Sequence, residues 1–370
     1  MRRAIAVCEP EPSHHHSPLE SVHRSQGGKL VDFAGWAMPI DYGSVLEEHN
    51  SCRENAVVFD VSHLGTVRVS GDSAFDALQW LLTNDLRRIE VGRAQYTHAL
   101  DATDAHVVDD IIVWWTGDHE FLVLPNAANT GPFLAALGEA ADRVDGDCEF
   151  EDITTTRALL AVQGPLSVDV LRALFPGAEM PGRFGVVRIT WQDVELIVAG
   201  TGYTGEDGVE IHVPAAAAGA LWEAVATAGA RPAGLGARDT LRLEMGYPLH
   251  GHELGAGVTP LQAGLGWVVG WDKEDFRGRE PLLAEQKTGP ARLLRGLLLS
   301  GRRFPREGYD VLSDGAVIGS VTSGNFSPTR GRGIALAFLP PDVQVGSEVA
   351  VDIRGRSANA TVVNPPFVER

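Results

Sequence analysis

The order of strand-like and helix-like segments is the feature that most constrains the fold of this chain. From about residue 28 to 285, strand-like apolar runs such as VVFDVSHLGTVRVSG, TRALLAVQG and VELIVAG alternate with helical runs such as LSVDVLRALF. After EQKTGPARLL the chain changes to short strands separated by Gly, Pro and Asp turns. This order predicts an α+β body followed by a small all-β, barrel-like domain.

Three segments follow from this pattern. We expect a disordered tail over residues 1–16, a body over 17–285 and a C-terminal β-barrel domain over 290–370. The tail contains three consecutive histidines, His14 to His16, between Ser and Pro residues, which favours an unstructured end. A weak metal site at these histidines is the alternative interpretation.

Composition narrows the class of protein. The 370 residues contain 49 acidic and 31 basic side chains, a formal charge of −18, which argues against nucleic acid or an anionic membrane surface as a partner. The three cysteines lie far apart and form no CxxC pair, so we expect neither a disulfide framework nor a metal centre. No apolar run approaches the roughly 20 residues that span a bilayer. We therefore expect a cytoplasmic protein.

Two adjacent acids interrupt the strand-like stretch HVVDDIIVWW. Because side chains alternate between the two faces of a strand, Asp109 and Asp110 point in opposite directions, each among apolar neighbours. An ionised carboxylate in such surroundings costs several kcal/mol (roughly) unless it is paired, hydrogen-bonded or open to a wet cavity. At least one of the two acids therefore has a specific purpose.

The stretch GTGYTGEDGVEIHV combines a glycine-rich loop with a strand. The loop allows close approach of the backbone to a ligand, and Tyr203 offers an aromatic wall. In the strand, Glu210 faces away from Val209 and Ile211, where its carboxylate can accept paired N–H donors from a planar heterocycle. A solvent-facing Glu on an edge strand is the alternative.

The stretch RPAGLGARDTLRLEMG predicts a helix with Arg238 and Arg242 one turn apart, and with Asp239 and Glu244 on the same helix. These charges can also be explained as surface ion pairs. The GLGARD segment lacks the G-x-G-x-x-G spacing of dinucleotide-binding loops.

Histidines provide further candidates. His63 in DVSHLG, and His250 and His252 in HGHE, are possible acids, bases or metal ligands, and an H-x-H pair places both rings on one face of a strand. Structural or hydrogen-bonding roles are the alternative for each. The chain has no G-x-S-x-G serine nucleophile motif.

Together these stretches resemble the glycine cleavage system T protein, or aminomethyltransferase, family. The resemblance also includes LLTNDL, GRAQYT, PNAAN, TPLQAGLGWVV and VTSGNFSPTRGRGIALA, and covers nearly everything after residue 16. It implies a folate-binding α+β body of two discontinuous, intertwined domains with a C-terminal β-barrel, arranged around a central pocket. It also implies tetrahydrofolate as co-substrate and the lipoylated H protein as partner.

The resemblance assigns roles to individual residues. The family's key carboxylate falls on Asp110, with Asp109 as a structural neighbour that points away. The remaining ligand-binding positions fall on Tyr96, Asn126, Tyr203, Glu210, Arg238 and Trp267, of which Glu210 corresponds to the pterin-binding acid. The sequence departs from the family pattern before the acid pair, where Ala105 and His106 replace an expected Gly-Gly turn.

The activity that the resemblance implies is transfer of a one-carbon unit from the aminomethyl-lipoyl H protein to tetrahydrofolate, with release of ammonia. Two alternatives remain open. One is a related folate-dependent demethylase that acts on a small N-methyl or sulfonium compound. The other is a non-catalytic folate-binding factor, although the chain lacks the K-x-C-Y-x-G-Q-E signature of the iron–sulfur cluster repair relatives.

Overall fold

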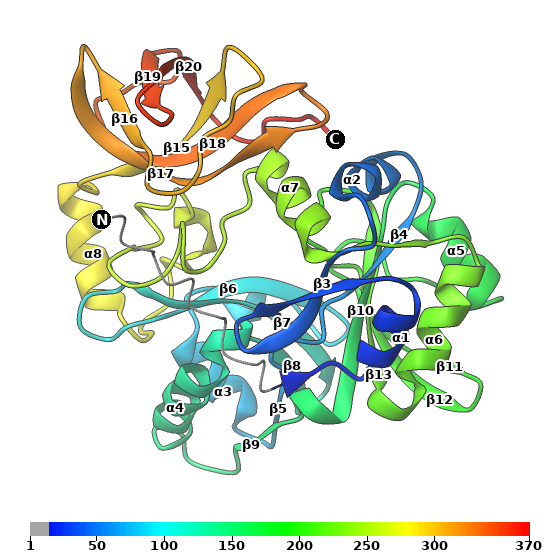
Figure 1. The fold of residues 1–370 in the computed structure, drawn as a ribbon. Coiled ribbons are helices and arrows are strands. Elements are labelled where there is room, and N and C mark those ends of the chain that lie inside the picture. The colour runs from blue at the N-terminus through cyan, green and yellow to red at the C-terminus, as the bar shows by residue number, and fades with distance from the viewer. Residues whose placement is uncertain (1–14) are drawn as a thin grey trace, which may run out of the picture.

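The computed structural model describes residues 15–370, in which two β-sheets form the body and a closed barrel forms the C-terminal part (Figure 1). The first sheet has the strand order β11-β12-β13-β10-β4-β14, and the second has the order β6-β7-β8-β5-β9. The first sheet consists of β4 (Val57–Asp60), β10 (Arg157–Gln163), β11 (Val186–Trp191), β12 (Val194–Ala199), β13 (Gly208–Pro214) and β14 (Arg231–Pro232). The second consists of β5 (Val67–Ser70), β6 (Ala94–Leu100), β7 (Val107–Gly117), β8 (Glu120–Leu124) and β9 (Glu149–Asp152).

The two sheets are interleaved in sequence. The chain leaves the first sheet after β4, builds the whole second sheet and returns to the first sheet at β10, which pairs antiparallel with β4. A smaller sheet near the N-terminus has the order β1-β3-β2 and consists of β1 (His15–His16), β2 (Lys29–Phe33) and β3 (Trp36–Asp41). The body is therefore a mixed α+β structure in which the first sheet is discontinuous in sequence and the second is inserted between β4 and β10.

Helices cover the outer faces of the two body sheets, and apolar side chains fill the space between these helices and the sheets. The helices are α1 (Glu20–Ser25), α2 (Val45–Glu54), α3 (Ala74–Leu81), α4 (Thr130–Ala141), α5 (Ser167–Leu174), α6 (Ala215–Thr227), α7 (Leu235–Met245) and α8 (Arg279–Thr288). Helices α5 and α6 share a core with the first sheet, and α3 and α4 share one with the second. A third cluster, which includes Phe59, Trp114 and Leu159, joins the inner faces of the two sheets.

The C-terminal part is a closed barrel with the strand order β15-β18-β17-β16-β19-β20. Its strands are β15 (Leu293–Leu299), β16 (Asp310–Ser313), β17 (Ala316–Ser327), β18 (Arg332–Leu339), β19 (Glu348–Asp352) and β20 (Ser357–Val363). The predicted C-terminal barrel is thus confirmed. Figure 1 shows helix α7 directly beneath the barrel, and Leu243 of α7 packs there against Ile334, Leu336 and Phe367.

Two sequence expectations are wrong in detail. His15 and His16 were assigned to the disordered tail, but they pair with Trp36 and Ala37 of β3, and the His15 ring stacks on Trp36 with centroids 5.1 Å apart. His14 lies outside the described residues. The run VVFDVSHLGTVRVSG, expected to behave as one strand-like unit, divides into β4 and β5, which belong to different sheets. Within residues 15–370, no helix combines the length and apolar character that a bilayer crossing requires.

Candidate active site

A cavity of about 1710 Å³ lies where the two body sheets, helix α7 and the barrel meet. Its wall includes Asp110 from β7, Glu210 from β13, Arg238 from α7, and Ser323 and Asn325 from the barrel strand β17. Cavities of this size hold small organic ligands, usually with a few convergent polar groups on a mostly apolar wall. All seven site residues expected from the sequence, Asp110, Tyr96, Asn126, Tyr203, Glu210, Arg238 and Trp267, line this cavity.

The two acids of β7 point in opposite directions, as the strand alternation predicts. Asp110 lies on the cavity wall, whereas Asp109 is fully buried behind it. The Asn126 side chain joins them, because its Nδ2 donates to Asp109 Oδ1 at 2.7 Å and to Asp110 Oδ1 at 2.9 Å. Asp109 also accepts from the backbone N of Asn126 at 2.9 Å and from Asn129 Nδ2 at 2.6 Å. Asp109 is thereby fixed by the protein, and Asp110 remains available to a ligand.

Burial raises the pKa values of both acids of this pair. Burial and the charge of Asp110 raise the pKa of Asp109 to about 8, although the hydrogen bonds from Asn126 and Asn129 act to lower it. Burial also raises the pKa of Asp110, although His250, Tyr96 and Asn126 oppose the rise. Two carboxyl groups this close resist carrying two charges. A cation in the cavity would relieve this cost, so the site favours chemistry in which positive charge develops beside Asp110.

Aromatic rings flank Asp110. The Tyr96 hydroxyl donates to Asp110 Oδ2 at 3.1 Å, and the Tyr96 ring lies 6.0 Å from that of Trp267, measured between centroids. Trp267 is 64% exposed, which is unusual for so large an apolar side chain. The planes of the two rings are inclined by 32°, and together they provide an aromatic wall suited to contact with a planar ring system.

Glu210 occupies the position that the sequence predicted, on the face of β13 opposite Val209 and Ile211. Its cross-strand neighbours are Ala161 on β10 and Ala199 on β12, whose small side chains leave room for the carboxylate. Glu210 is 5% exposed, and its Oε2 accepts from Thr201 Oγ1 at 2.5 Å. The alternative of a solvent-facing glutamate is therefore wrong. Thr201 leaves acceptor capacity on the carboxylate for a donor in the cavity.

Arg238 and Tyr203 form the adjacent wall. The Arg238 guanidinium carbon lies 4.9 Å from the centroid of the Tyr203 ring, and that ring stacks on Tyr247 at 5.7 Å. Burial lowers the pKa of Arg238, and the negative charge of Glu210 opposes this effect. Arg238 Nη1 is buried and has no hydrogen-bond partner within the described part of the chain. A buried donor without a partner costs about 1–3 kcal/mol, which points to a ligand acceptor at this position.

Comparison with known proteins decides the family. The model of the glycine cleavage T-protein N-terminal domain matches residues 19–273, and that of the glycine cleavage T-protein C-terminal barrel domain matches residues 292–369. The chain belongs to the glycine cleavage T-protein, or aminomethyltransferase, family. Aminomethyltransferases from Mycobacterium tuberculosis (strain ATCC 25618 / H37Rv) and Parafrankia sp. (strain EAN1pec) are both 47% identical to it; each alignment covers 95% of this chain, and 96% and 97% of the relative, respectively. The crystal structure of glycine cleavage system aminomethyltransferase T from Bartonella henselae superposes with a TM-score of 0.89 at 33% identity, covering 95% of this chain and 98% of that one.

The turn before the acid pair departs from the T-protein pattern in sequence but keeps a glycine-like backbone. Ala105, which stands at an expected glycine, has φ 60°, in the left-handed region that L residues rarely adopt. His106 is held by Asp104, whose Oδ1 lies 2.6 Å from His106 Nδ1. A bulge between Ala99 and Leu100 absorbs one residue of β7. Asp110 consequently keeps its orientation toward the cavity.

The histidine and helix expectations are partly wrong. His250 and His252 both line the cavity, but they lie in a turn with an isolated bridge and not on one face of a strand. His63 is buried at the cavity wall, and burial lowers its pKa to about 4, so it is neutral near pH 7. In α7, Arg242 and Glu244 are buried, so the alternative of surface pairs fails for both.

Sequence reasoning missed several residues of this T-protein site. His98 stands directly opposite Asp110 across β6 and β7, and its Nε2 lies 3.3 Å from the Tyr96 hydroxyl. A signal existed, because His98 and Tyr96 are two residues apart on one strand and share a face. No comparable local signal marks the other residues that were missed. Asn129 donates to Asp109 and Thr201 donates to Glu210, whereas Arg53 binds Glu206 of the glycine-rich loop.

Proposed function

We propose that this chain transfers the one-carbon unit of an aminomethyl group, carried on the lipoyl arm of an H protein, to tetrahydrofolate, with release of ammonia. The products are 5,10-methylenetetrahydrofolate and the dihydrolipoyl H protein. Family membership supports this reaction, and the observation that carries it is the incompletely paired Asp110 carboxyl on the wall of a cavity large enough for a folate.

The cavity suits a reduced pterin. Such a ring presents adjacent N–H donors, which a carboxylate accepts well, and Glu210 has free acceptor capacity at the wall. Arg238 offers an unpaired donor on the neighbouring wall. The glycine-rich loop also leaves no space for larger residues, since a Cβ at Gly202 would lie 2.0 Å from Gln163 Oε1 and one at Gly205 would lie 2.4 Å from Met245 Sδ. We propose Glu210 as the pterin anchor and Arg238, Tyr203, Tyr96, Asn126 and Trp267 as further folate contacts.

Asp110 acts by electrostatics in this account. Tetrahydrofolate supplies the amine that accepts the one-carbon unit, and positive charge develops near that amine as the new bond forms. A carboxylate held in place by Tyr96 and Asn126 stabilises this charge without reorganisation at the moment of reaction. Asp109 keeps Asn126 in position. An amine needs no strong base before it attacks, so we assign Asp110 the role of charge stabiliser and orienting group.

The H protein must dock where its lipoyl arm can reach Asp110. The chain is strongly acidic overall, so we propose that docking uses local basic positions near the cavity, among them the exposed Arg302 and Arg303 of the loop SGRRFPREG. Arg306 of the same loop lines the cavity. Charges at the rim of an interface change the association rate and the salt dependence more than the final affinity.

The direct test mixes purified protein with tetrahydrofolate and aminomethylated H protein and measures ammonia. We expect ammonia and 5,10-methylenetetrahydrofolate in equal amounts, and a higher KM for H protein when Arg302 and Arg303 are both changed to Gln. An unchanged KM would remove this basic loop from the docking site. Formation of methylenetetrahydrofolate from a small N-methyl or sulfonium compound, without H protein, would replace the proposal by the demethylase. Tetrahydrofolate binding without any turnover would indicate a folate-binding factor.

A further inference from the structure

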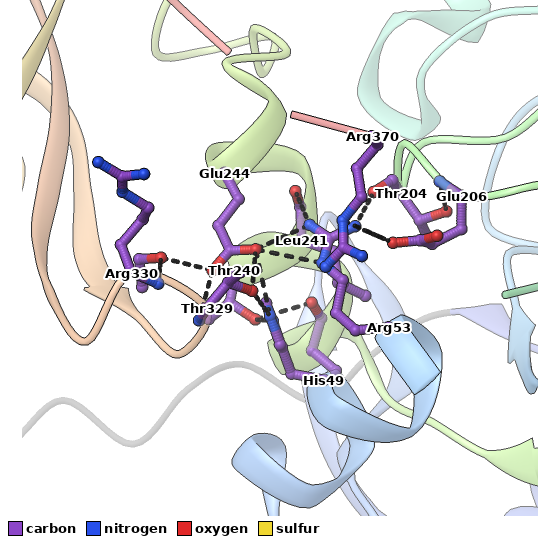
Figure 2. A network of polar contacts seen from close by, with 12 residues as sticks. His49, Arg53, Thr204, Glu206, Thr240, Leu241, Glu244, Thr329, Arg330 and Arg370 are labelled. Atoms are coloured by element: carbon purple, nitrogen blue, oxygen red, sulfur yellow. Dashed lines mark hydrogen bonds and ion pairs between the residues drawn. The ribbon is translucent and has the colours of Figure 1, made fainter. Parts of the chain in front are cut away.

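A polar network holds the glycine-rich loop of the cavity, residues 200–208, in place (Figure 2). Two of its members, Glu206 and Arg370, also line the cavity. Glu206 lies near the end of this loop, and its Oε1 receives two cationic donors. Arg53 Nη1 donates to it at 2.8 Å, and Arg370 Nε lies 3.1 Å from the same atom. The Glu206 side chain is only 9% exposed. One loop carboxylate therefore joins helix α2 to the last residue of the chain.

Arg53 uses its planar fork to connect three segments. Its Nη1 also donates to the backbone O of Thr204 in the loop at 2.7 Å, and its Nη2 donates to Leu241 O at 3.3 Å and to Glu244 Oε2 at 2.8 Å. Its Nε reaches the same Glu244 oxygen at 3.2 Å. Every N–H of the guanidinium thus has an acceptor, and a group with such directional bonds fixes its partners in space.

Glu244 continues the network into the barrel. Its carboxylate accepts from Ser327 Oγ at 2.5 Å, and from Thr329 N at 3.0 Å and Thr329 Oγ1 at 2.9 Å. Ser327 ends β17, and Thr329 follows it in the turn to β18. Figure 2 shows Glu244 between this turn and Arg53. The barrel, α7, α2 and the glycine-rich loop are therefore connected through two buried charged side chains.

The C-terminal tail has a defined course to Glu206. The backbone N of Phe367 donates to Glu244 O at 2.8 Å, and Phe367 and Val368 are buried against the barrel and α7. Gly246, which ends α7 with φ 67°, lies so close to the tail that a Cβ there would be 2.1 Å from Pro365 Cβ. These contacts place Arg370 beside the loop, with its side chain still 26% exposed.

We propose that the C-terminal residue Arg370 is a positioning residue for the ligand site. Arg370 and Arg53 hold Glu206 from two directions, so the packed C-terminal tail fixes the glycine-rich loop that carries Tyr203 and leads into Glu210. The part of this inference that concerns folate rests on the function proposed above. The part that concerns the loop does not, because it describes the protein without ligand.

Arg370→Gln tests the inference without removing a buried group. We expect faster amide hydrogen exchange over residues 200–208 in the free protein, and a KM for tetrahydrofolate about two- to fivefold higher, the size expected of a partly exposed ion pair. The kcat and the melting temperature should change little, because Arg370 contacts neither Asp110 nor the core. Arg356→Gln, at an exposed arginine of the barrel, is the matched control and should leave both measurements unchanged.

A double-mutant cycle separates positioning from direct contact with the ligand. If Arg370 acts through Glu206, then Arg370→Gln causes no further rise in KM in a Glu206→Ala background. The same fold-rise in both backgrounds would mean that Arg370 touches the ligand itself and would overturn the inference. Unchanged amide hydrogen exchange over residues 200–208 in Arg370→Gln would also overturn the inference. This measurement is sufficient by itself if Glu206→Ala does not fold. Changed exchange in a protein that neither binds nor turns over tetrahydrofolate would refute the proposed function and leave the loop inference standing.

Discussion

The acid pair at the cavity and Glu244 at the joint between body and barrel have opposite electrostatic surroundings. Asp109 and Glu244 are fully buried, and Asp110 is half-buried on the cavity wall. Burial raises the pKa of Glu244, but hydrogen bonds from His49 and Ser327 and the charges of His49 and Arg53 outweigh it and bring the pKa to about 2. At the cavity the balance is reversed, because burial dominates and the pKa values of both aspartates rise. Donors from the protein satisfy Glu244 completely. Within residues 15–370, by contrast, Asp110 receives side-chain hydrogen bonds only from Tyr96 and Asn126.

This difference indicates how structural and functional acids are distinguished. Asp109 and Glu244 are equally buried but have pKa values shifted in opposite directions, so burial alone does not decide the role of an acid. Glu244 is ionised and fully paired within the protein, and removing it costs stability. A functional acid is held at a free-energy cost because its partner arrives with the ligand.

Glu244→Gln should have the largest effect on stability. The change leaves Arg53 buried beside a neutral amide, and breaking a buried ion pair in this way costs about 3–5 kcal/mol. Denaturant unfolding measures this loss, and Glu195→Gln, in an exposed pair with Arg188, is the control, with an expected change near zero. Equal, small losses in both variants would show that the Glu244 network contributes little to stability.

The pH dependence of unfolding should have opposite signs at the two acid groups. The folded-state pKa of Glu244 is about 2, below its usual 4.5, so its stabilisation is present above pH 4.5 and is lost as the pH falls toward 2. At about 1.4 kcal/mol per unit this amounts to about 3 kcal/mol. The folded-state pKa of Asp109 is raised from 3.8 to about 8, so its contribution is present below pH 3.8 and is lost as the pH rises through 8. The free energy of unfolding should be measured as a function of pH. Glu244→Gln should abolish the decrease in stability at acid pH, and Asp109→Asn should abolish the decrease at alkaline pH.

Glu210→Gln should weaken folate binding while the fold is retained. The variant keeps the side-chain volume but loses the charge-assisted acceptor, which is worth about 1.5–3 kcal/mol, or about ten- to a hundredfold in Kd. Calorimetric titration with tetrahydrofolate measures the change. Glu223→Gln, at an exposed position of α6, should leave Kd unchanged. An unaltered affinity in Glu210→Gln would exclude the anchor role.

Asp109→Asn should lower stability more than it lowers turnover. An amide cannot accept all three N–H donors that Asn126 and Asn129 direct at this position, so we expect a loss of about 1–3 kcal/mol in the free energy of unfolding. Asp118→Asn, at an exposed position, is the control. Turnover lost at unchanged stability would reverse the roles of the two aspartates.

The sequence predicted those parts of the molecule that local patterns specify. Strand alternation placed Asp109 and Asp110 on opposite faces and Glu210 toward the cavity, and the change of pattern after residue 285 predicted the barrel. The residues it missed meet through contacts between distant segments: Arg53 and Glu244 are 191 positions apart, and Arg53 and Glu206 are 153 apart. Such pairs leave no periodicity in a single sequence. The split between β4 and β5 was missed for a related reason, because a strand pattern does not reveal which sheet a strand joins.

The turnover of Asp110→Asn measures how much this carboxyl group contributes to the transfer reaction. Ammonia release from aminomethylated H protein in the presence of tetrahydrofolate should fall by about a hundredfold, since one fixed charge at the reacting centre contributes about 3 kcal/mol. The melting temperature should be retained or rise, because the variant removes a half-buried carboxyl group that Tyr96 and Asn126 do not fully pair. Turnover close to that of the unaltered chain, in a variant that still binds tetrahydrofolate, would contradict the assignment of Asp110 as the group that stabilises the developing charge.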